Sequence, residues 1–175
     1  MSRYTLKVYP AGRGREIYRT IRISGKDTLD RLCEFILESF DFIHEHLYEF
    51  CMDNRMYSED SYQYDPEDGG PSTNIAIDRI GLVKGQNFSL HYDYGDDWMF
   101  TIHVQKIEDE MQKTNPELIK SVGVLEQYPD YEDWDEDDEF WVTRVNFLGS
   151  SQLWKFSEGY WNLADFAVLW LWESG

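Results

Sequence analysis

Alternating apolar and polar residues predict that the chain opens with a β-hairpin. Residues 4–9 and 16–23 both alternate with a period of two, and residues 10–14 between them include proline and glycine. The next stretch has apolar residues every three or four positions, which predicts an amphipathic helix with Asp27 as its N-terminal cap. The apolar positions of this helix are Leu29, Leu32, Cys33, Ile36 and Phe40.

A second hairpin is predicted in the middle of the chain. Residues 88–94 and 98–104 alternate in the same way, and Gly95, Asp96 and Asp97 join them as a turn. One face would carry a wide aromatic and aliphatic surface suited to packing against the helix. The residues of that face are Phe88, Leu90, Tyr92, Tyr94, Trp98, Phe100, Ile102 and Val104, and those of the polar face are Ser89, His91, Asp93, Thr101 and His103.

Shorter patterns predict the remaining elements. They are a strand at 47–52, a mobile polar loop at 53–73, a strand or helical turn at 75–80, helices at 117–125 and 162–172, and a strand at 140–148. The predicted fold class is α+β: a curved, mostly antiparallel sheet built from two hairpins, a packed helix, and a C-terminal helical and acidic extension. We expect one domain over residues 1–175, with a core at 1–125 and an addition at 126–175.

Composition supports a folded protein. Hydrophobic residues make up 42% of the chain and aromatic residues 17%, which is enough for a core. The longest apolar run, 163–172, is half of the roughly 20 residues that cross a bilayer, so no membrane span is predicted. Because no apolar signal segment precedes the first strand, a cytoplasmic location is expected. Cys33 and Cys51 are predicted to be buried, reduced thiols, with a disulfide between them as the alternative.

The charge of the chain is unusual and unevenly distributed. The net charge is −18, with +3 on residues 1–40 and −21 on residues 41–175. Such a surface repels phosphate groups and anionic lipids, so no direct binding to nucleic acid or membranes is expected. The one basic cluster in the sequence is small, and it consists of Arg13, Arg15, Arg19 and Arg22.

Residues 126–139 combine nine acidic side chains with aromatic ones and contain no basic residue. Acidic residues interleaved with Tyr and Trp can steer a protein partner electrostatically and anchor it. The alternative is a solvated, mobile loop. The predicted partner contacts are Asp130, Tyr131, Asp133, Trp134, Asp135 and Asp137.

A divalent metal site is a second interpretation. His44 and His46 would point to one side of an extended segment, and carboxylates near the turn of the second hairpin suit hard cations. Ordinary turn chemistry and helix capping explain the same residues without a metal. The candidate ligands are His44, His46, His91, Asp93, Asp96 and His103. An EF-hand at 133–144 is excluded, because Asp138 and Arg144 occupy the positions of its glycine and its last glutamate.

Several short motifs occur in a familiar order. They are Tyr4-x-Leu6-Lys7-Val8, Ile17-Tyr18-Arg19-x-Ile21-x-Ile23, Thr28-Leu29-x-x-Leu32, His46-Leu47-x-x-Phe50, and Tyr92-Asp93-Tyr94-Gly95-Asp96-Asp97-Trp98 followed by Ile102-x-Val104. Over about residues 3–125 the chain resembles the plasmid pRiA ORF-three-like family, whose members also occur as passenger proteins of insertion elements. Family members have Ile-Trp-Arg at 17–19, Tyr-Asp-Phe-Gly-Asp at 92–96, and a Pro-Pro-Glu-Asp segment near 128–133 that this chain lacks. The resemblance implies an α+β fold with a curved antiparallel sheet, and it implies no catalytic residue.

The sequence therefore predicts a non-enzymatic binding module for a protein partner, with no cofactor. It contains no Gly-x-Ser-x-Gly, Walker or dinucleotide-binding motif. A metal-dependent hydrolase or metal-binding protein is the alternative from another class. Nucleic-acid mimicry is a special case of partner binding, since a net charge of −18 matches that of roughly 30 Å of duplex DNA.

Overall fold

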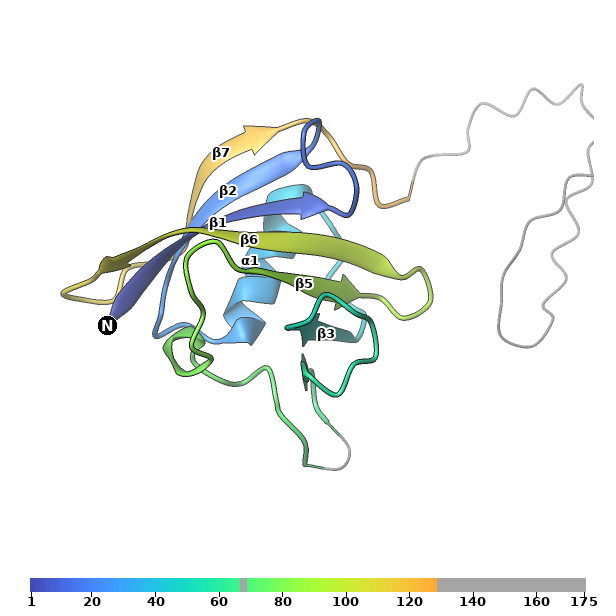
Figure 1. Cartoon of the computed structure of the whole chain (residues 1–175). Helices are drawn as coiled ribbons and strands as arrows, with labels where there is room; N and C mark the ends of the chain where they lie inside the picture. The colour runs from blue at the N-terminus through green and yellow to red at the C-terminus, as the bar shows by residue number, and fades with distance from the viewer. Residues whose placement is uncertain (67–68, 129–175) are drawn as a thin grey trace, which may run out of the picture. The chain divides into compact units, whose positions relative to one another are not determined.

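The computed structural model describes residues 1–66 and 69–128, which form one curved antiparallel sheet with a single α-helix against one face (Figure 1). The strand order is β4-β3-β5-β6-β1-β2-β7, and the sheet does not close. The strands are β1 Ser2–Pro10, β2 Tyr18–Ser24, β3 Tyr48–Cys51, β4 Ser61–Gln63, β5 Asn87–Tyr92, β6 Trp98–Asp109 and β7 Glu117–Val122.

Both predicted hairpins are confirmed, and they join through their long strands. β1 pairs with β2, and β5 pairs with β6. β1 also pairs with β6, with Leu6 opposite Val104, so the two hairpins form the centre of one sheet. Because side chains alternate across a strand, the predicted apolar residues of these strands face the core together. Leu6, Val8, Phe88, Leu90 and Phe100 are all fully buried.

Helix α1, Leu29–Phe40, covers the inner face of the sheet as its apolar spacing predicts. All five predicted core positions of the helix are buried. The N-terminal cap is Thr28 and not Asp27: the Thr28 hydroxyl accepts the Arg31 N–H at 3.2 Å. Asp27 is buried and forms an ion pair with Lys113 at 2.5 Å, so a tertiary contact takes the side chain that local spacing assigned to the cap.

The predicted α+β class with a helical extension is wrong for the described residues. They form a predominantly antiparallel sheet of seven strands with one α-helix. The segment predicted as a helix at 117–125 is strand β7, which pairs with β2. A six-residue apolar and polar run fits a short helix or a strand equally well, and the open edge of β2 decides between them.

Of two shorter segments, one differs in part from the prediction and the other agrees with one of its two alternatives. The predicted loop 53–73 contains strand β4, which pairs with β3, so this prediction is wrong in part. Residues 75–80 form a helical turn, the 3-10 helix η1 at Ile77–Arg79. Cys33 and Cys51 are buried free thiols, as predicted. No helix among the described residues is long and apolar enough to span a membrane. The strand predicted at 140–148 and the helix predicted at 162–172 lie outside the described residues.

Candidate functional site

A chain of three polar side chains lies on the face of the sheet opposite α1. Glu49 of β3 and His91 of β5 are cross-strand partners with fully buried side chains. Glu49 Oε1 lies 3.0 Å from His91 Nδ1, and Asp97 Oδ1 lies 2.8 Å from His91 Nε2. Both ring nitrogens of His91 thus lie within hydrogen-bonding distance of a carboxylate oxygen, one from a neighbouring strand and one from the turn after β5.

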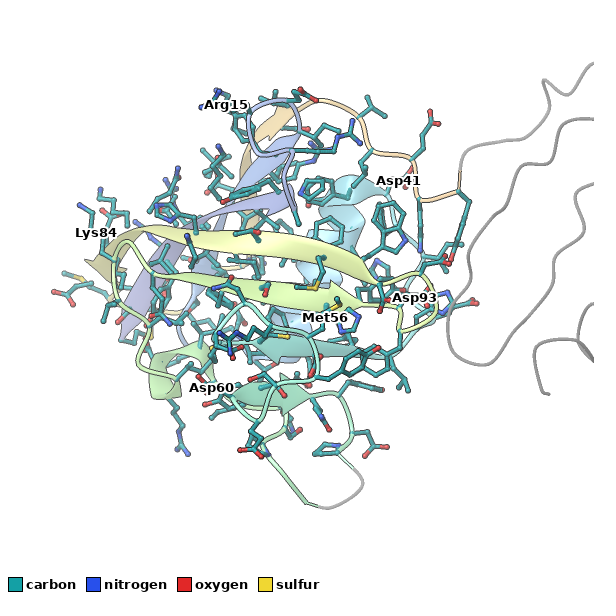
Figure 2. The ribbon with its side chains drawn as sticks, turned by 45° about the vertical axis from the view of Figure 1, so that its right-hand side comes forward. Arg15, Asp41, Met56, Asp60, Lys84 and Asp93 are labelled. Carbon is teal, nitrogen blue, oxygen red and sulfur yellow. The ribbon has the colours of Figure 1, made fainter. Side chains whose placement is uncertain are left out.

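The loop after β3 folds over this polar chain. The backbone N–H of Tyr57 donates to Glu49 Oε1 at 2.7 Å, and the Tyr57 ring stands perpendicular to the His91 ring at 5.1 Å. The Tyr94 ring lies 4.9 Å from His91 on the turn side. Figure 2 shows Met56 of the same loop beside the sheet. The polar chain therefore fixes a surface loop to the sheet.

The Cys51 thiol and the Tyr94 hydroxyl, which lie near the polar chain, are protonated and unreactive near neutral pH. Burial, followed by the charge of Glu49, raises the pKa of the Cys51 thiol to about 12. The same two causes raise the pKa of Tyr94 to about 12. Neither side chain supplies a nucleophile at these values. Glu49 Oε2 and Ser89 Oγ are buried and make no hydrogen bond within the described residues.

The turn between β5 and β6 uses Asp93 as its organising residue. Asp93 has a left-handed backbone with a φ of 60°, and its Oδ1 accepts the Gly95 N–H at 3.0 Å. Its carbonyl accepts the N–H groups of Asp96 and Asp97 at 3.2 and 2.7 Å. Asp93 and Asp97 supply the positive φ values of this turn and Gly95 does not, because aspartate tolerates this conformation.

The structure places the six candidate metal ligands in separate surroundings: His44, His46, His91, Asp93, Asp96 and His103. His46 Nδ1 lies 3.6 Å from Asp93 Oδ2, which is the one close pair among them. His91 belongs to the polar chain, and His103 Nδ1 lies 2.6 Å from Asn87 Oδ1. Within residues 1–66 and 69–128, no group of three His, Cys, Asp or Glu side chains has the arrangement of a metal site.

Sequence reasoning found His91 but missed its partners. Glu49 lies in a strand whose four residues are all buried, and nothing in its local pattern marks it. Register is the signal that identifies it, since β3 pairs with β5 so that Glu49 faces His91. The predicted partner contacts, Asp130, Tyr131, Asp133, Trp134, Asp135 and Asp137, lie outside the described residues.

Strand β7 forms one edge of the sheet. It pairs with β2 on one side, and no strand among the described residues pairs with its other side. Leu118 and Ile119 expose 43% and 42% of their surface. A register shift opposite Thr20 and Ile21 marks a bulge, which places Ile119 outside the ladder. An exposed strand edge with apolar side chains can accept another strand.

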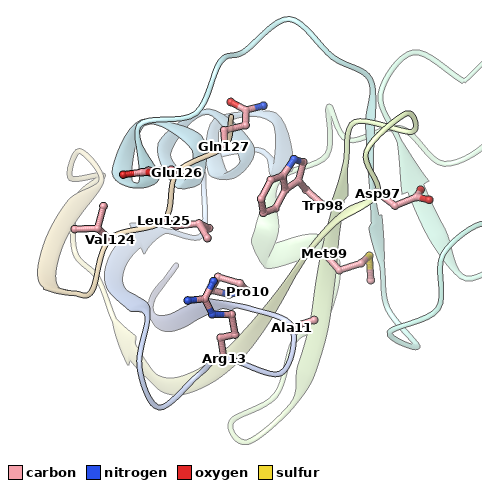
Figure 3. A pocket seen from close by; sticks show the side chains of 10 residues that line it. All are labelled: Pro10, Ala11, Arg13, Asp97, Trp98, Met99, Val124, Leu125, Glu126 and Gln127. Atoms are coloured by element: carbon pink, nitrogen blue, oxygen red, sulfur yellow. The ribbon is translucent and has the colours of Figure 1, made fainter. Parts of the chain in front are cut away.

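A groove of about 690 Å³ lies beside the chain segment that follows β7 (Figure 3). Pro10, Trp98 and Leu125 give it an apolar lining, and Arg13 adds a cation. Asp97 of the polar chain is also among the residues that line the groove, so the groove borders the polar chain (Figure 3). The buried indole N–H of Trp98 makes no hydrogen bond within the described residues. The β7 edge thus exposes apolar side chains, and the groove combines apolar residues with the charged side chains of Arg13, Asp97 and Glu126.

These features define a single-sheet protein with one covering helix and an open strand edge. A family model described as plasmid pRiA4b ORF-3-like protein matches residues 2–133, and the chain belongs to this family. A solved structure, a protein of unknown function, MM3350 from Methanosarcina mazei Go1, has a similar fold with a TM-score of 0.58. That similarity covers 70% of this chain and 72% of the other at 24% identity. None of the curated proteins matches this chain.

Proposed function

We propose that this protein is a non-enzymatic binding module that takes up an extended segment of a protein partner as an additional strand along β7. The observation that carries the proposal is the open edge of β7 with its exposed Leu118 and Ile119. Main-chain hydrogen bonds would supply affinity, and side chains at alternate positions would supply specificity.

The neighbouring groove supports the same proposal. Exposed Val124 and the lining residue Leu125 follow β7 directly in sequence, so a segment paired with β7 would lie near the groove. Aromatic anchors in partner proteins fill apolar pockets of this kind. The charged residues Glu117 and Lys120 and the bulge limit indiscriminate pairing at this edge.

The acidic and aromatic segment remains a second predicted contact in the same function. Its charge would steer a partner with a basic surface, whereas the β7 edge would hold the partner through backbone and apolar contacts. The two contributions differ in their response to salt, because screening weakens the electrostatic steering and leaves the contacts along β7 unchanged.

The test is capture of a partner from host lysate by three versions of the full chain: wild type, Ile119→Lys and Val83→Lys. Val83 is the matched control, since it is 60% exposed and lies in the loop before β5. We expect a stoichiometric partner that binds wild type and Val83→Lys alike and binds Ile119→Lys at least tenfold more weakly. In the reconstituted complex, amide hydrogen exchange of 117–122 should slow. Unchanged exchange in β7, or full binding by Ile119→Lys, would exclude strand addition at this edge.

A further inference from the structure

A second groove, of about 780 Å³, lies on the outer face of the sheet between β1, β6 and the loop joining β1 to β2. Its lining includes Lys7, Arg13, Arg15 and His103, with Glu16 as the one acidic residue. Figure 2 shows Arg15 at the tip of the loop between β1 and β2. The groove is therefore basic in a chain whose net charge is −18.

The cations of this groove lack carboxylate partners. No ion pair within the described residues involves Lys7, Arg13 or Arg15. Lys120, on the neighbouring strand β7, is likewise without an ion pair there. Other basic residues of the outer face are neutralised: Arg22 pairs with Glu117 at 3.1 Å, and Lys106 pairs with Glu108 at 2.8 Å.

Lys7 is held in place by neutral groups. Its ammonium donates to the Gly14 carbonyl at 2.8 Å and lies 4.3 Å from the centre of the Tyr18 ring. Lys120 contacts the same ring at 5.2 Å. A Cβ at position 14 would lie 2.6 Å from the Tyr9 ring, so glycine allows the loop to pack on that side chain. A lysine fixed this way keeps its charge available and loses little side-chain entropy when it binds an anion.

We infer that this groove binds the phosphodiester backbone of single-stranded nucleic acid. Lys7, Arg13 and Arg15 line the groove, and Lys120 lies outside that lining but contacts the same Tyr18 ring as Lys7. Together these four cations exceed what a single anionic group needs, and they suit a run of phosphates. Thr101 and Asn87 also line the groove and add a hydroxyl and an amide, which are neutral groups able to form hydrogen bonds with sugars or bases. The Tyr18 ring lies beside Lys7 and Lys120, as aromatic residues lie beside cations on single-strand-binding surfaces.

A single strand fits this face better than a duplex or an acidic peptide. The sheet curves around α1, so its outer face is convex (Figure 1) and would meet the convex surface of a duplex over a small area. An acidic peptide would satisfy the cations but would make no use of the neighbouring aromatic ring. The inference departs from the expectation of no nucleic-acid binding, which rested on the net charge of −18 and on the small size of the one basic cluster, a cluster that included Arg19. The fold turns Arg19 inward and adds Lys7 and Lys120 from distant parts of the sequence.

The test is fluorescence anisotropy of a labelled thymidine oligonucleotide of about 12 nucleotides with the full-length chain at 50 and 200 mM salt. With four phosphate contacts, affinity should fall about fiftyfold between the two salt concentrations. Lys7→Gln and Arg15→Gln should each weaken binding at low salt by about three- to tenfold and reduce the salt slope by roughly 0.7. The matched control is Arg79→Gln, which removes one exposed charge on η1, away from the groove.

Arg15 makes no side-chain hydrogen bond within the described residues, so Arg15→Gln tests the groove even if Lys7→Gln disturbs the hairpin. Thermal unfolding of each variant checks that the fold is intact. Equal losses in Arg15→Gln and Arg79→Gln would overturn the inference, because they would reflect overall charge alone. Tighter binding of the matched duplex, or of a glutamate-rich peptide of equal charge, would also overturn it.

Discussion

Replacing Arg19 by methionine should destabilise the protein strongly, because this side chain joins three parts of the fold. Arg19 is 6% exposed and faces the core side of β2. Its guanidinium donates to the carbonyls of Ser39 at 2.7 Å, Val122 at 2.9 Å and Gly123 at 3.2 Å, and it packs over the Phe40 ring at 4.3 Å. It thus connects the end of α1 to the end of β7.

The expected cost follows from these contacts. A hydrogen bond to a charged group contributes roughly 1.5–3 kcal/mol, and methionine keeps most of the apolar contact with Phe40 while leaving three carbonyls without this donor. Water can reach some of these groups after the change, so we expect a loss of about 3–5 kcal/mol in the free energy of unfolding. Urea denaturation measures it, and with a slope of about 1.5 kcal/mol/M the midpoint should fall by roughly 2–3 M.

Arg22→Met is the matched control for this prediction. Arg22 lies on the same strand but on the outer face, where it forms one exposed ion pair with Glu117. Exposed pairs of this kind contribute about 0–1 kcal/mol. If the two variants lose similar stability, or Arg19→Met loses less than about 1 kcal/mol, the reasoning is refuted. Amide exchange at 117–122 should also accelerate more in Arg19→Met than in Arg22→Met.

Three further predictions concern the buried polar groups. Glu49→Gln should lower the free energy of unfolding, measured by urea denaturation, by about 3 kcal/mol, because it removes the buried charge beside His91. Asp97→Asn changes a half-exposed carboxylate and should lower it by roughly 1 kcal/mol or less. Equal losses in the two variants would contradict the role given to the polar chain. Burial raises the pKa of Asp78, but hydrogen bonds from the Ser2 N–H and the Tyr4 hydroxyl outweigh it and leave the pKa below its usual value. The stability that Asp78 contributes is therefore complete above the unfolded-state pKa of about 4 and is lost as pH falls through the lower folded-state pKa, so Asp78→Asn should flatten the acid limb of urea midpoints measured from pH 6 to 2.5. Burial above all raises the pKa values of Cys33 and Cys51, so a thiol reagent at pH 8 should modify neither in the native protein and both in denaturant; rapid native labelling would show that the thiols are accessible.

The elements that sequence reasoning predicted well are those with long periodic patterns. The two central hairpins and α1 each extend over enough residues for the period of two or of 3.6 to be read directly. Their burial follows from the same pattern, because a sheet with one covering helix needs one continuous apolar face. The family resemblance agrees with these elements, since its motifs lie mainly on β1, β2, α1, β3 and the turn after β5.

The errors fall where a short segment depends on a distant one. Strand β7 has six residues, and only its pairing with β2, about 100 residues earlier, distinguishes it from a helix. Asp27 has the residue type of a cap, but Lys113 pairs with it and Thr28 caps the helix. These contacts are tertiary, so local propensity could not predict them.

The polar chain and the basic groove also depend on contacts between distant segments, which the sequence pattern does not reveal. The alternating pattern assigned Ser89, His91 and Asp93 to the polar face of the second hairpin, and it gave no sign that all three are buried. The loop after β3 places Tyr57 over His91, and a polar loop sequence gives no sign of where it will pack. The basic surface is likewise invisible in the sequence, because Lys7 of the groove and Lys120 beside it are 113 positions apart. Pairing of β1 and β7 with β2 brings both lysines to the Tyr18 ring.

The two proposed surfaces should separate by their response to salt. At physiological ionic strength, salt screens charges beyond about 8 Å. The groove cations can therefore attract a phosphate that they contact, while most of the charges that make up the net charge of −18 are screened from it. Binding in the groove must therefore weaken steeply as salt rises. Pairing along β7 depends on backbone hydrogen bonds and on Leu118 and Ile119, so it should change little under the same conditions. A ligand whose binding depends on both Arg15 and Ile119 would have to extend across β2, from the loop between β1 and β2 to the β7 edge. Each variant would then remove one part of its affinity.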